Sequence, residues 1–296
     1  MNLIVGATGM LGGEICRLLA DRSEPTRALV RSTSNPDRVA SLRERGIDVV
    51  HGDLKDPSSL HAACDGVRAV VSTASSTLTR QEGDSIDSVD RQGQLSLVDA
   101  AERAGVTQFV LVSFPEIDAT FPLQSAKRAV EERLRRSRMI HTILQPTFFT
   151  EVWLSPALGF DPLHGTARIY GAGQNKISWI SFVDVAKFAV DVLDNPRASN
   201  STIELGGPDA LSPLDVVRLV EQASGATMRV EHVPEDVLRA QCSTDTDPLQ
   251  QSFAALMLGY ARGEVVDMTD TLRAFPVGQL KAVHEHFHAV SHTGRT

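Results

Sequence analysis

The sequence predicts an α/β fold, in which a doubly wound parallel sheet is combined with a smaller, interleaved C-terminal region. In its first half, short apolar runs alternate with amphipathic segments of about 10–15 residues, which is typical of repeated strand–helix–strand units. The apolar runs lack strict polar–apolar alternation, which indicates strands covered on both faces. From about residue 148 aromatic, proline and glycine residues become frequent. This change predicts a substrate-binding portion interleaved with the end of the sheet.

The expected strands are short, and right-handed crossovers should join them into a parallel sheet. They are residues 3–5, 27–30, 48–51, 69–72, 108–112 and 141–144, with a returning strand at 202–205. We therefore expect residues 1–150 to form the first domain, with sheet elements returning at about residues 176–210. Residues 151–296 should form mainly the substrate-binding C-terminal region.

The expected helices begin and end at residues with the right capping chemistry. Residues 10–21 follow the first strand, and Asp56 before Pro57 fits an N-cap with proline at the first helical position. The segment 88–104 has apolar residues at helical spacing and stops at Gly105. The spacing of a capping box recurs at residues 181–184 and 212–215.

Composition excludes several classes of protein. The 296 residues are 42% hydrophobic and 22% charged, which excludes wholesale disorder. A formal net charge of −8 argues against nucleic acid as a partner. Three scattered cysteines, no leader-like segment and no apolar run of about 20 residues predict a cytoplasmic protein without a membrane span. Both a monomer and a homo-oligomer fit these numbers.

A glycine-rich segment stands between the first expected strand and the first expected helix. Residues 6–12 read GATGMLG, a GxxGxxG spacing. Glycines let the backbone approach a pyrophosphate closely, and the helix N-terminus supplies free N–H groups and a positive dipole end. The position of the motif predicts a Rossmann-type dinucleotide site. The alternative is a tight turn that binds no ligand.

The ends of the next strands offer further cofactor contacts. Arg31 follows the second strand, where an arginine can hold a 2′-phosphate, so NADP(H) is favoured over NAD(H); the alternative is a solvated surface arginine. Asp53 can accept a hydrogen bond from the adenine amine or act only as a turn residue. The small residues Ser72, Thr73 and Ala74 would let a dinucleotide pass over the sheet edge.

Six ordered motifs resemble the NmrA-like branch of the atypical short-chain dehydrogenases/reductases, which includes quinone-reductase-like, triphenylmethane-reductase-like and isoflavone-reductase-like members. The resemblance spans most of residues 1–210 and continues more weakly to 276. It implies a seven-stranded, largely parallel sheet with a cofactor across its carboxyl edge. The motifs are GATGMLG at 6–12, ALVRSTS at 28–34, GDLKDPSSL at 52–60, AAERAGVTQFVLVSF at 100–114, TILQPTFF at 142–149 and ISFVDVAKFAV at 180–190.

The resemblance also implies roles for single residues. Ser113 matches the serine of the superfamily, and Lys127 matches a lysine of isoflavone-reductase-like members. Lys127 would bind the nicotinamide ribose or donate a proton; the plain alternatives are an exposed lysine and, for Ser113, a satisfied strand-end hydroxyl. The implied cofactor contacts are Gly6, Thr8, Gly9, Met10, Leu11 and Gly12 at the pyrophosphate, Arg31 at the 2′-phosphate, Asp53 and Leu54 at the adenine, and Pro146, Thr147 and Phe148 at the nicotinamide.

One family feature is missing. Most of these dehydrogenases use a Tyr-x-x-x-Lys pair to protonate the product alkoxide. Here Leu123 stands four residues before Lys127, and Tyr170 and Tyr260 precede Gln174 and Glu264 at that spacing. A site without this acid suits electron-poor substrates whose reduced form is a stable anion.

The sequence therefore predicts an NADPH-dependent oxidoreductase that transfers hydride to a small hydrophobic substrate such as a quinone or an enone. The rival hypothesis is a non-catalytic NADP(H)-binding redox sensor of the NmrA type. Residues 284–288 match HExxH, but a site beside a chain end is a poor zinc centre, and no metal is expected. Candidate substrate contacts are Phe149, Trp153, Tyr170 and Tyr260.

Overall fold

The computed structural model describes residues 1–287, and its contacts divide the chain into two compact units. The first unit comprises Met1–Ser113, Pro122–Gln145 and Val185–Ile203. The second comprises Phe114–Phe121, Pro146–Asp184 and the chain from Glu204 onward. Each unit therefore takes up several stretches of the chain.

The first unit is built on a seven-stranded sheet with the strand order β10-β6-β5-β4-β1-β2-β3. Neighbouring strands from β3 to β6 pair in parallel, with Val5 opposite both Leu29 and Ser72. This arrangement confirms the predicted doubly wound α/β fold. The strands are β1 (Asn2–Val5), β2 (Thr26–Val30), β3 (Asp48–His51), β4 (Ala69–Ser72), β5 (Gln108–Val112), β6 (Ile140–Pro146) and β10 (Ser201–Leu205).

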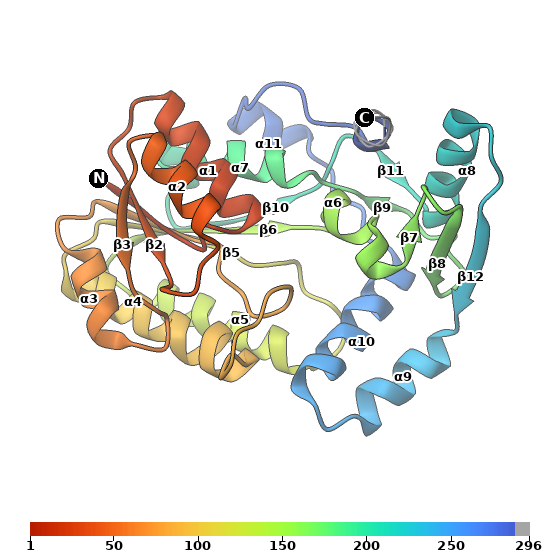
Figure 1. Ribbon diagram of the computed structural model, residues 1–296, viewed down its shortest axis with the longest axis horizontal. Coiled ribbons are helices and arrows are strands. Elements are labelled where there is room, and N and C mark those ends of the chain that lie inside the picture. The colour runs from red at the N-terminus through yellow and green to blue at the C-terminus, as the bar shows by residue number, and fades with distance from the viewer. Residues whose placement is uncertain (288–296) are drawn as a thin grey trace. The chain divides into compact units, whose positions relative to one another are not determined.

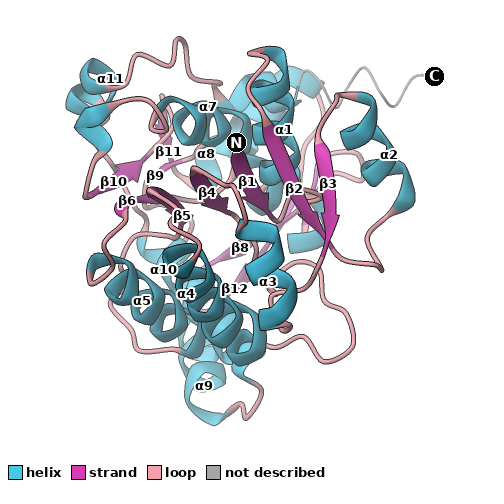
Figure 2. Ribbon diagram, turned by 90° about the vertical axis from the view of Figure 1, so that its left-hand side faces the viewer, coloured by secondary structure: helices cyan, strands magenta, loops and turns pink. Residues whose placement is uncertain are grey.

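Helices cover both faces of this sheet. Helices α1, α2 and α7 lie on one face and α3, α4 and α5 on the other, as Figure 2 shows. Between them, side chains such as Leu3, Phe109 and Leu97 are fully buried, so the strands read as continuous apolar runs. The helices are α1 (Met10–Asp21), α2 (Pro36–Glu44), α3 (Pro57–Cys64), α4 (Gln94–Arg103), α5 (Pro122–Arg135) and α7 (Phe182–Asp191), with a short 3₁₀ turn at Pro196–Ala198.

The helix expected at 88–104 differs from the prediction at its start. The chain forms a π-helix, η1 (Ile86–Gly93), before it continues as α4. The spacing of buried residues does not distinguish the two helix types, which is why the sequence indicated one α-helix. Gly93 has a steric reason to be glycine, since an added Cβ would lie 2.8 Å from the Leu54 Cβ.

Three of the predicted helix boundaries are confirmed. The Asp56 side chain accepts from the Ser58 N–H, and Ser212 forms a capping box with Asp215. At the third, the helix begins after Ser181 as expected, but the Ser181 hydroxyl accepts from the Val183 N–H at 3.2 Å, one residue earlier than in a capping box. The Asp184 carboxylate is fully buried and accepts from the Lys281 N–H at 2.7 Å. The carboxylates of Asp184 and Asp215 therefore act as structural acceptors.

The second unit has a core of its own around two small sheets (Figure 1). Strands β12, β8 and β7 form one sheet, β11 and β9 form the other, and helices α9 and α10 pack side by side. The elements are α6 (Thr150–Trp153), a 3₁₀ turn at Pro156–Leu158, β7 (Phe160–Asp161), β8 (Thr166–Tyr170), β9 (Ile177–Ser178), β11 (Ala210–Leu211), α8 (Pro213–Ser224), β12 (Arg229–Val233), α9 (Glu235–Thr244), α10 (Pro248–Arg262) and α11 (Thr269–Ala274).

The turn between β1 and α1 is closely packed. Gly6 has a φ of +90°, a conformation that favours glycine, and its carbonyl accepts from the Gly9 N–H at 2.9 Å. A Cβ on Gly12 would lie 2.2 Å from the Gly6 oxygen. The glycines at 6 and 12 thus let α1 begin directly against the end of β1.

We expect Gly12→Ala to destabilise the protein by about 2–4 kcal/mol, because its Cβ would meet backbone atoms that cannot move aside. Gly13→Ala is the matched control in the same helix, since its Cβ would lie 3.4 Å from the nearest atom, the Ala7 oxygen. Its stability should stay within about 1 kcal/mol of wild type. Urea unfolding of the three proteins measures both effects. Equal stability of the two variants would contradict this account of the turn.

His141 on β6 should make stability depend on pH. Burial first, and then the charge of Arg135, lower the pKa of His141 below its usual value, and its Nδ1 is buried without a partner among residues 1–287. The unfolded chain therefore takes up this proton at a higher pH than the folded chain. Stability should be fully present above the ordinary histidine pKa of about 6.5 and fall as the pH drops toward the folded pKa.

Unfolding measured from pH 7.5 to 5 in wild type and His141→Asn tests this. The variant should lose less stability over that range. The lowered pKa of His286, which is caused first by burial, would leave a residual slope in both proteins. An identical pH dependence in wild type and variant would exclude the role of His141.

Candidate functional site

The N-terminus of α1 is open to an anion. Gly9 is its N-cap, no side chain caps the helix, and no acidic residue lies in its first turn. The turn of Gly6 and Thr8 thus leads into backbone N–H groups at the positive end of the helix dipole. Met10 is exposed and Leu11 is buried. This geometry can hold a phosphate group.

The end of β4 lies directly against this turn. The Thr73 hydroxyl donates to the Val5 oxygen at 3.2 Å and would lie 2.6 Å from a Cβ on Gly6. The Ser72 hydroxyl is buried and donates to Gln94, whose amide donates to the Ala74 oxygen at 2.9 Å. The side chain of Ser72 is thus committed to the fold, and the segment is held close to the glycine turn.

Two cations share one carboxylate beyond the ends of β2 and β3. Arg31 and Lys55 each lie 2.6 Å from Asp84, whose side chain is 1% exposed while both cations are partly exposed. Burial alone would raise the pKa of Asp84, but hydrogen bonds from Lys55, the Gln81 N–H and Arg31 outweigh it and hold that pKa below its usual value. The cluster keeps one excess positive charge.

Sequence analysis identified Arg31 but missed Lys55 and Asp84. Asp84 stands 53 residues after Arg31 on a loop with no motif, so no local pattern pointed to it. The sequence also gave no reason to single out Arg38 on α2, whose guanidinium donates to the Thr8 oxygen at 2.5 Å. Arg38 adds a further positive charge at the glycine turn.

Asp53 and Leu54 have structural roles in the turn after β3. The Asp53 carboxylate accepts from the Lys55 N–H at 2.9 Å, which is the turn contact that the sequence left open. Leu54 is buried in the core of the first unit. Of these two residues, Asp53 is only partly buried, so its side chain can still contact a ligand.

Ser113, after β5, belongs to a buried polar cluster. Its hydroxyl donates to Glu131 at 2.6 Å, and Gln145 donates to the same oxygen at 3.2 Å. Arg128 also pairs with that oxygen, and Arg135 reaches the other carboxylate oxygen at 3.2 Å. Because the Ser113 hydroxyl donates to Glu131, its oxygen can act only as an acceptor, and Arg128 Nη1 donates to it at 3.5 Å.

Lys127 on α5 is buried, so the interpretation as an exposed lysine is wrong. It is 6% exposed, and its Nζ lies 3.7 Å from Oδ1 of Asp90. Asp90 comes from η1 and is fully buried. The sequence suggested Lys127 through the family resemblance, whereas a lone aspartate in a helical pattern gave no reason to single out Asp90.

Residues 146–148 are fixed within the second unit. The Thr147 hydroxyl donates to the Ser178 oxygen, and its N–H donates to the Leu205 oxygen at 2.9 Å. Pro146 and Phe148 are buried. Pro146 is the last residue of β6, and Thr147 and Phe148 follow it directly.

An aromatic cluster surrounds Tyr260 in the second unit. Its ring stacks on Trp153 with 5.5 Å between centroids and meets Tyr170 edge-on at 5.4 Å. Phe148 and Trp179 approach the same ring at 6.1 and 5.7 Å. Tyr260 is 2% exposed, and burial followed by the neighbouring Tyr170 raises its pKa, so the phenol is neutral.

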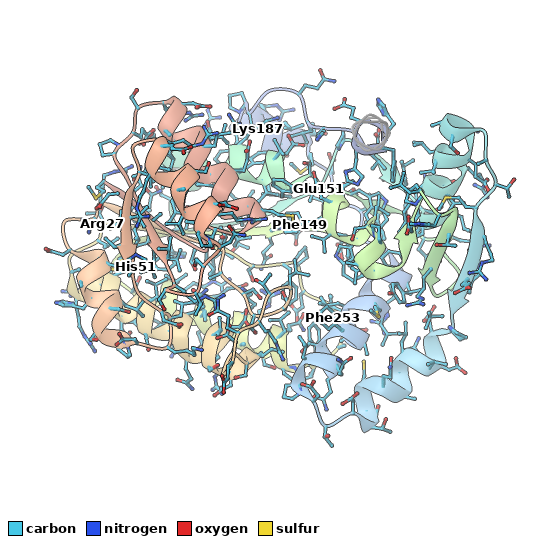
Figure 3. The ribbon with its side chains drawn as sticks, viewed as in Figure 1. Arg27, His51, Phe149, Glu151, Lys187 and Phe253 are labelled. Atoms are coloured by element: carbon cyan, nitrogen blue, oxygen red, sulfur yellow. The ribbon has the colours of Figure 1, made fainter. Side chains whose placement is uncertain are left out.

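The candidate substrate residues differ in burial and in whether their hydroxyl groups already have hydrogen-bond partners. The Tyr170 hydroxyl donates to the Leu158 oxygen at 3.2 Å, whereas the Tyr260 hydroxyl has no hydrogen-bond partner within residues 1–287. Trp153 and Phe149 are only partly buried. Phe149 stands beside Glu151 at the start of α6, and both are labelled in Figure 3.

The HExxH match at residues 284–288 lies only partly within the described residues. His288 and His292 lie outside the described residues, and within residues 1–287 no three histidine, cysteine or acidic side chains gather as metal ligands. In the same part of the chain, no helix has the length and apolar character required to cross a bilayer.

The sequence is similar to those of known proteins over most of its length. An NAD(P)H azoreductase of Xenophilus azovorans is 32% identical over 232 residues, which cover 77% of this chain and 76% of that protein. The photosystem II assembly factor Ycf39 of Synechocystis sp. is 30% identical over 244 residues, 80% of this chain and 72% of the relative.

The fold also occurs among solved structures. The NADPH-dependent quinone oxidoreductase QOR2 of Escherichia coli, crystallised with NADPH, gives a TM-score of 0.75 at 23% identity, with 100% of both chains covered. A model of the NmrA-like family matches residues 2–263. The expected resemblance is therefore confirmed, and this protein belongs to the NmrA-like family.

Proposed function

We propose that this protein is an NADPH-dependent oxidoreductase that transfers hydride to a small, hydrophobic, electron-poor substrate. The observation that carries the proposal is the open N-terminus of α1 beside a set of cations, Arg31, Lys55 and Arg38. A dinucleotide pyrophosphate needs the first feature, and a 2′-phosphate needs the second. NADPH, when bound, supplies the hydride.

The chain binds and orients this cofactor. The glycine turn of Gly6 and Gly12 admits the pyrophosphate to the N–H groups of α1. Asp84 holds Arg31 and Lys55 in place before any ligand arrives, so less side-chain entropy is lost on binding. The anionic 2′-phosphate then gains contact with a cluster that carries one excess positive charge.

The lack of a suitable proton donor in the first unit supports an electron-poor substrate. Ser113 donates to Glu131 and so offers a substrate no proton, and the chain contains no Tyr-x-x-x-Lys pair. Reduction of an unactivated ketone needs an acid at the developing alkoxide, whereas reduction of a quinone or a cationic dye forms a product that is stable without one. Lys127 is the remaining buried cation of this unit that can bind an oxygen.

The relatives support the same reaction class. The azoreductase relative acts with NAD(P)H on azo compounds by its name, and the QOR2 neighbour is a quinone oxidoreductase. Quinones and azo dyes are both flat, aromatic and electron-poor. Aromatic side chains such as Trp153 and Phe149 would contact substrates of this kind, with Tyr260 as a neutral hydrogen-bond donor.

The test is NADPH oxidation by the purified protein with a panel of quinones, azo dyes, triphenylmethane dyes and enones. Cofactor binding is followed by fluorescence in the same samples. Turnover with one class identifies the substrate chemistry. Tight binding without oxidation of any acceptor would instead favour a second candidate, a dinucleotide-binding sensor or assembly protein, which the Ycf39 relative and the missing Tyr-x-x-x-Lys pair support.

Arg31→Ala should weaken NADPH binding by about 10–100-fold while leaving NADH binding almost unchanged, because one charge-assisted contact to a phosphate contributes about 1.5–3 kcal/mol. Lys55→Ala should act in the same direction. Arg43→Ala removes an exposed charge from the end of α2 and is the matched control. Fluorescence titrations at fixed ionic strength measure the ratio of the NADPH and NADH dissociation constants for each variant. Equal losses for both cofactors would refute the assignment to a 2′-phosphate.

Tyr260→Phe should lower kcat/KM for oxygen-bearing acceptors by about 3–10-fold, the contribution of one neutral hydrogen bond. Its stability should not fall, because the hydroxyl has no partner within residues 1–287. Tyr170→Phe is the matched control: it loses the bond to Leu158 and should cost about 1 kcal/mol of stability with little effect on kcat/KM. The reverse pattern would remove Tyr260 from the proposed site.

A further inference from the structure

Residues 77–84, which we call the strap, cross the carboxyl edge of the sheet after β4. The far end of the strap, Asp84, contacts Arg31 directly after β2 and Lys55 in the turn after β3. In the strand order β4-β1-β2-β3, the end of β1 lies between the start of the strap and these contacts. The strap therefore passes the glycine turn, at the edge where a doubly wound sheet binds a dinucleotide.

The strap is held by polar contacts rather than by packing in the core. All of its residues are exposed or only partly buried, and Leu78 is 56% exposed. The Thr33 hydroxyl donates to the side chain of Gln81, and the Glu82 carbonyl accepts from Lys55 at 3.3 Å. A segment with few buried apolar contacts can open locally, so these polar contacts decide how often the strap is closed.

Asp84 makes the strongest of these attachments. Its side chain is 1% exposed, with Oδ1 2.6 Å from Lys55 Nζ and Oδ2 2.6 Å from Arg31 Nη1. Its Oδ2 also accepts from the Gln81 N–H at 2.9 Å, which fixes the turn at the end of the strap. Hydrogen bonds between ionised groups are about twice as strong as neutral ones. Asp84 therefore locks the strap to the ends of β2 and β3.

Both cations keep donors for a second anion. An arginine has five N–H donors and a lysine has three. Asp84 takes one donor from each cation, and the Glu82 carbonyl takes one more from Lys55. The side chains of Arg31 and Lys55 are 30% and 29% exposed, whereas that of Asp84 is almost fully buried. A phosphate can thus meet the exposed side of the cations without displacing Asp84.

We propose that the strap responds to the 2′-phosphate of the cofactor: a 2′-phosphate bound by Arg31 and Lys55 favours the closed strap, and Asp84 transmits this effect. Cations that a phosphate already orders lose less side-chain entropy when Asp84 docks on them. By thermodynamic reciprocity, the closed strap favours 2′-phosphate binding by the same factor. This inference rests on the proposed function, which supplies the 2′-phosphate. Asp84 is a positioning residue, because it acts on the ligand through the two cations.

Arg80 provides a direct readout of strap opening. It is exposed, and residues 77–84 contain no other arginine or lysine. Trypsin needs a segment detached from its neighbours, so the rate of cleavage after Arg80 follows the population of the open strap. The masses of the fragments 1–80 and 81–296 identify this cleavage. The probes are adenosine 2′,5′-bisphosphate and adenosine 5′-monophosphate, which differ only in the 2′-phosphate.

With both probes at saturation, the bisphosphate should slow cleavage after Arg80 about fivefold more than the monophosphate does. NADP⁺ and NAD⁺ should differ in the same direction. Equal protection by the two probes would overturn the inference. Faster cleavage with the bisphosphate would also overturn it, because the phosphate would then displace Asp84 from the cations.

Asp84→Asn should raise the rate of cleavage without ligand about tenfold and remove the difference between the two probes. It should also bind the bisphosphate about fivefold more weakly, although the cluster becomes more positive. Glu82→Gln makes the same change in net charge at an exposed position of the strap and is the matched control, with cleavage and binding close to wild type. Tighter binding by Asp84→Asn, which the added positive charge alone would give, would contradict the coupling.

Folding and the proposed function are controlled separately. Melting temperatures show whether Asp84→Asn folds. If it does not, Thr33→Ala replaces it, since it removes a tie to the strap and keeps every charge and the cleavage site. Thr33→Ala should raise the rate of cleavage about 2–5-fold, and no change would count against the strap. A wild-type protein that binds NADPH without protecting Arg80 overturns this inference alone, whereas one that does not bind NADPH overturns the proposed function as well.

Discussion

The close approach of α1 to the end of β1 is the constraint on which the candidate site depends. A Cβ at Gly12 would lie 2.2 Å from the Gly6 oxygen, and one at Gly6 would lie 2.6 Å from the Thr73 hydroxyl. These two missing Cβ atoms let the helix start at the strand and let the segment after β4 pack beside it. The first turn of α1 therefore starts at the sheet edge with no side-chain cap on its N–H groups.

Buried carboxylates organise the polar parts of the first unit. Asp84 pairs with Arg31 and Lys55, and Glu131 pairs with Arg128 and accepts from Ser113. In both clusters the cations reach hydrogen-bond distance, which is what a buried charge requires. Asp90 departs from this pattern, because its cation stays 3.7 Å away while one oxygen is unsatisfied within residues 1–287.

Local patterns in the sequence predicted the sheet and the glycine turn, because both depend on short-range chemistry. Apolar runs define β3, β4 and β5 at the expected residues, and the turn follows from glycine spacing. The partners of the site residues could not be predicted in this way. Asp84 meets Arg31 across 53 positions, and Ser113 meets Glu131 across 18, so only the folded backbone brings them together. The π-helix at Ile86–Gly93 was missed because its buried positions repeat with the same spacing as those of an α-helix.

The hydrogen bonds made by the hydroxyl groups restrict the class of substrate more than the fold does. The Ser113 hydroxyl donates to Glu131, and the Tyr170 hydroxyl donates to the Leu158 oxygen. Burial raises the pKa of Tyr260 and so keeps its phenol neutral. None of these groups is arranged as a strong acid toward an alkoxide. Hydride acceptors that stabilise their own negative charge need only hydrogen bonds, and Lys127 is a buried cation of the first unit that could donate one. A chain without a Tyr-x-x-x-Lys sequence would therefore suit hydride acceptors that carry the negative charge themselves, so that the protein need not supply a strong acid.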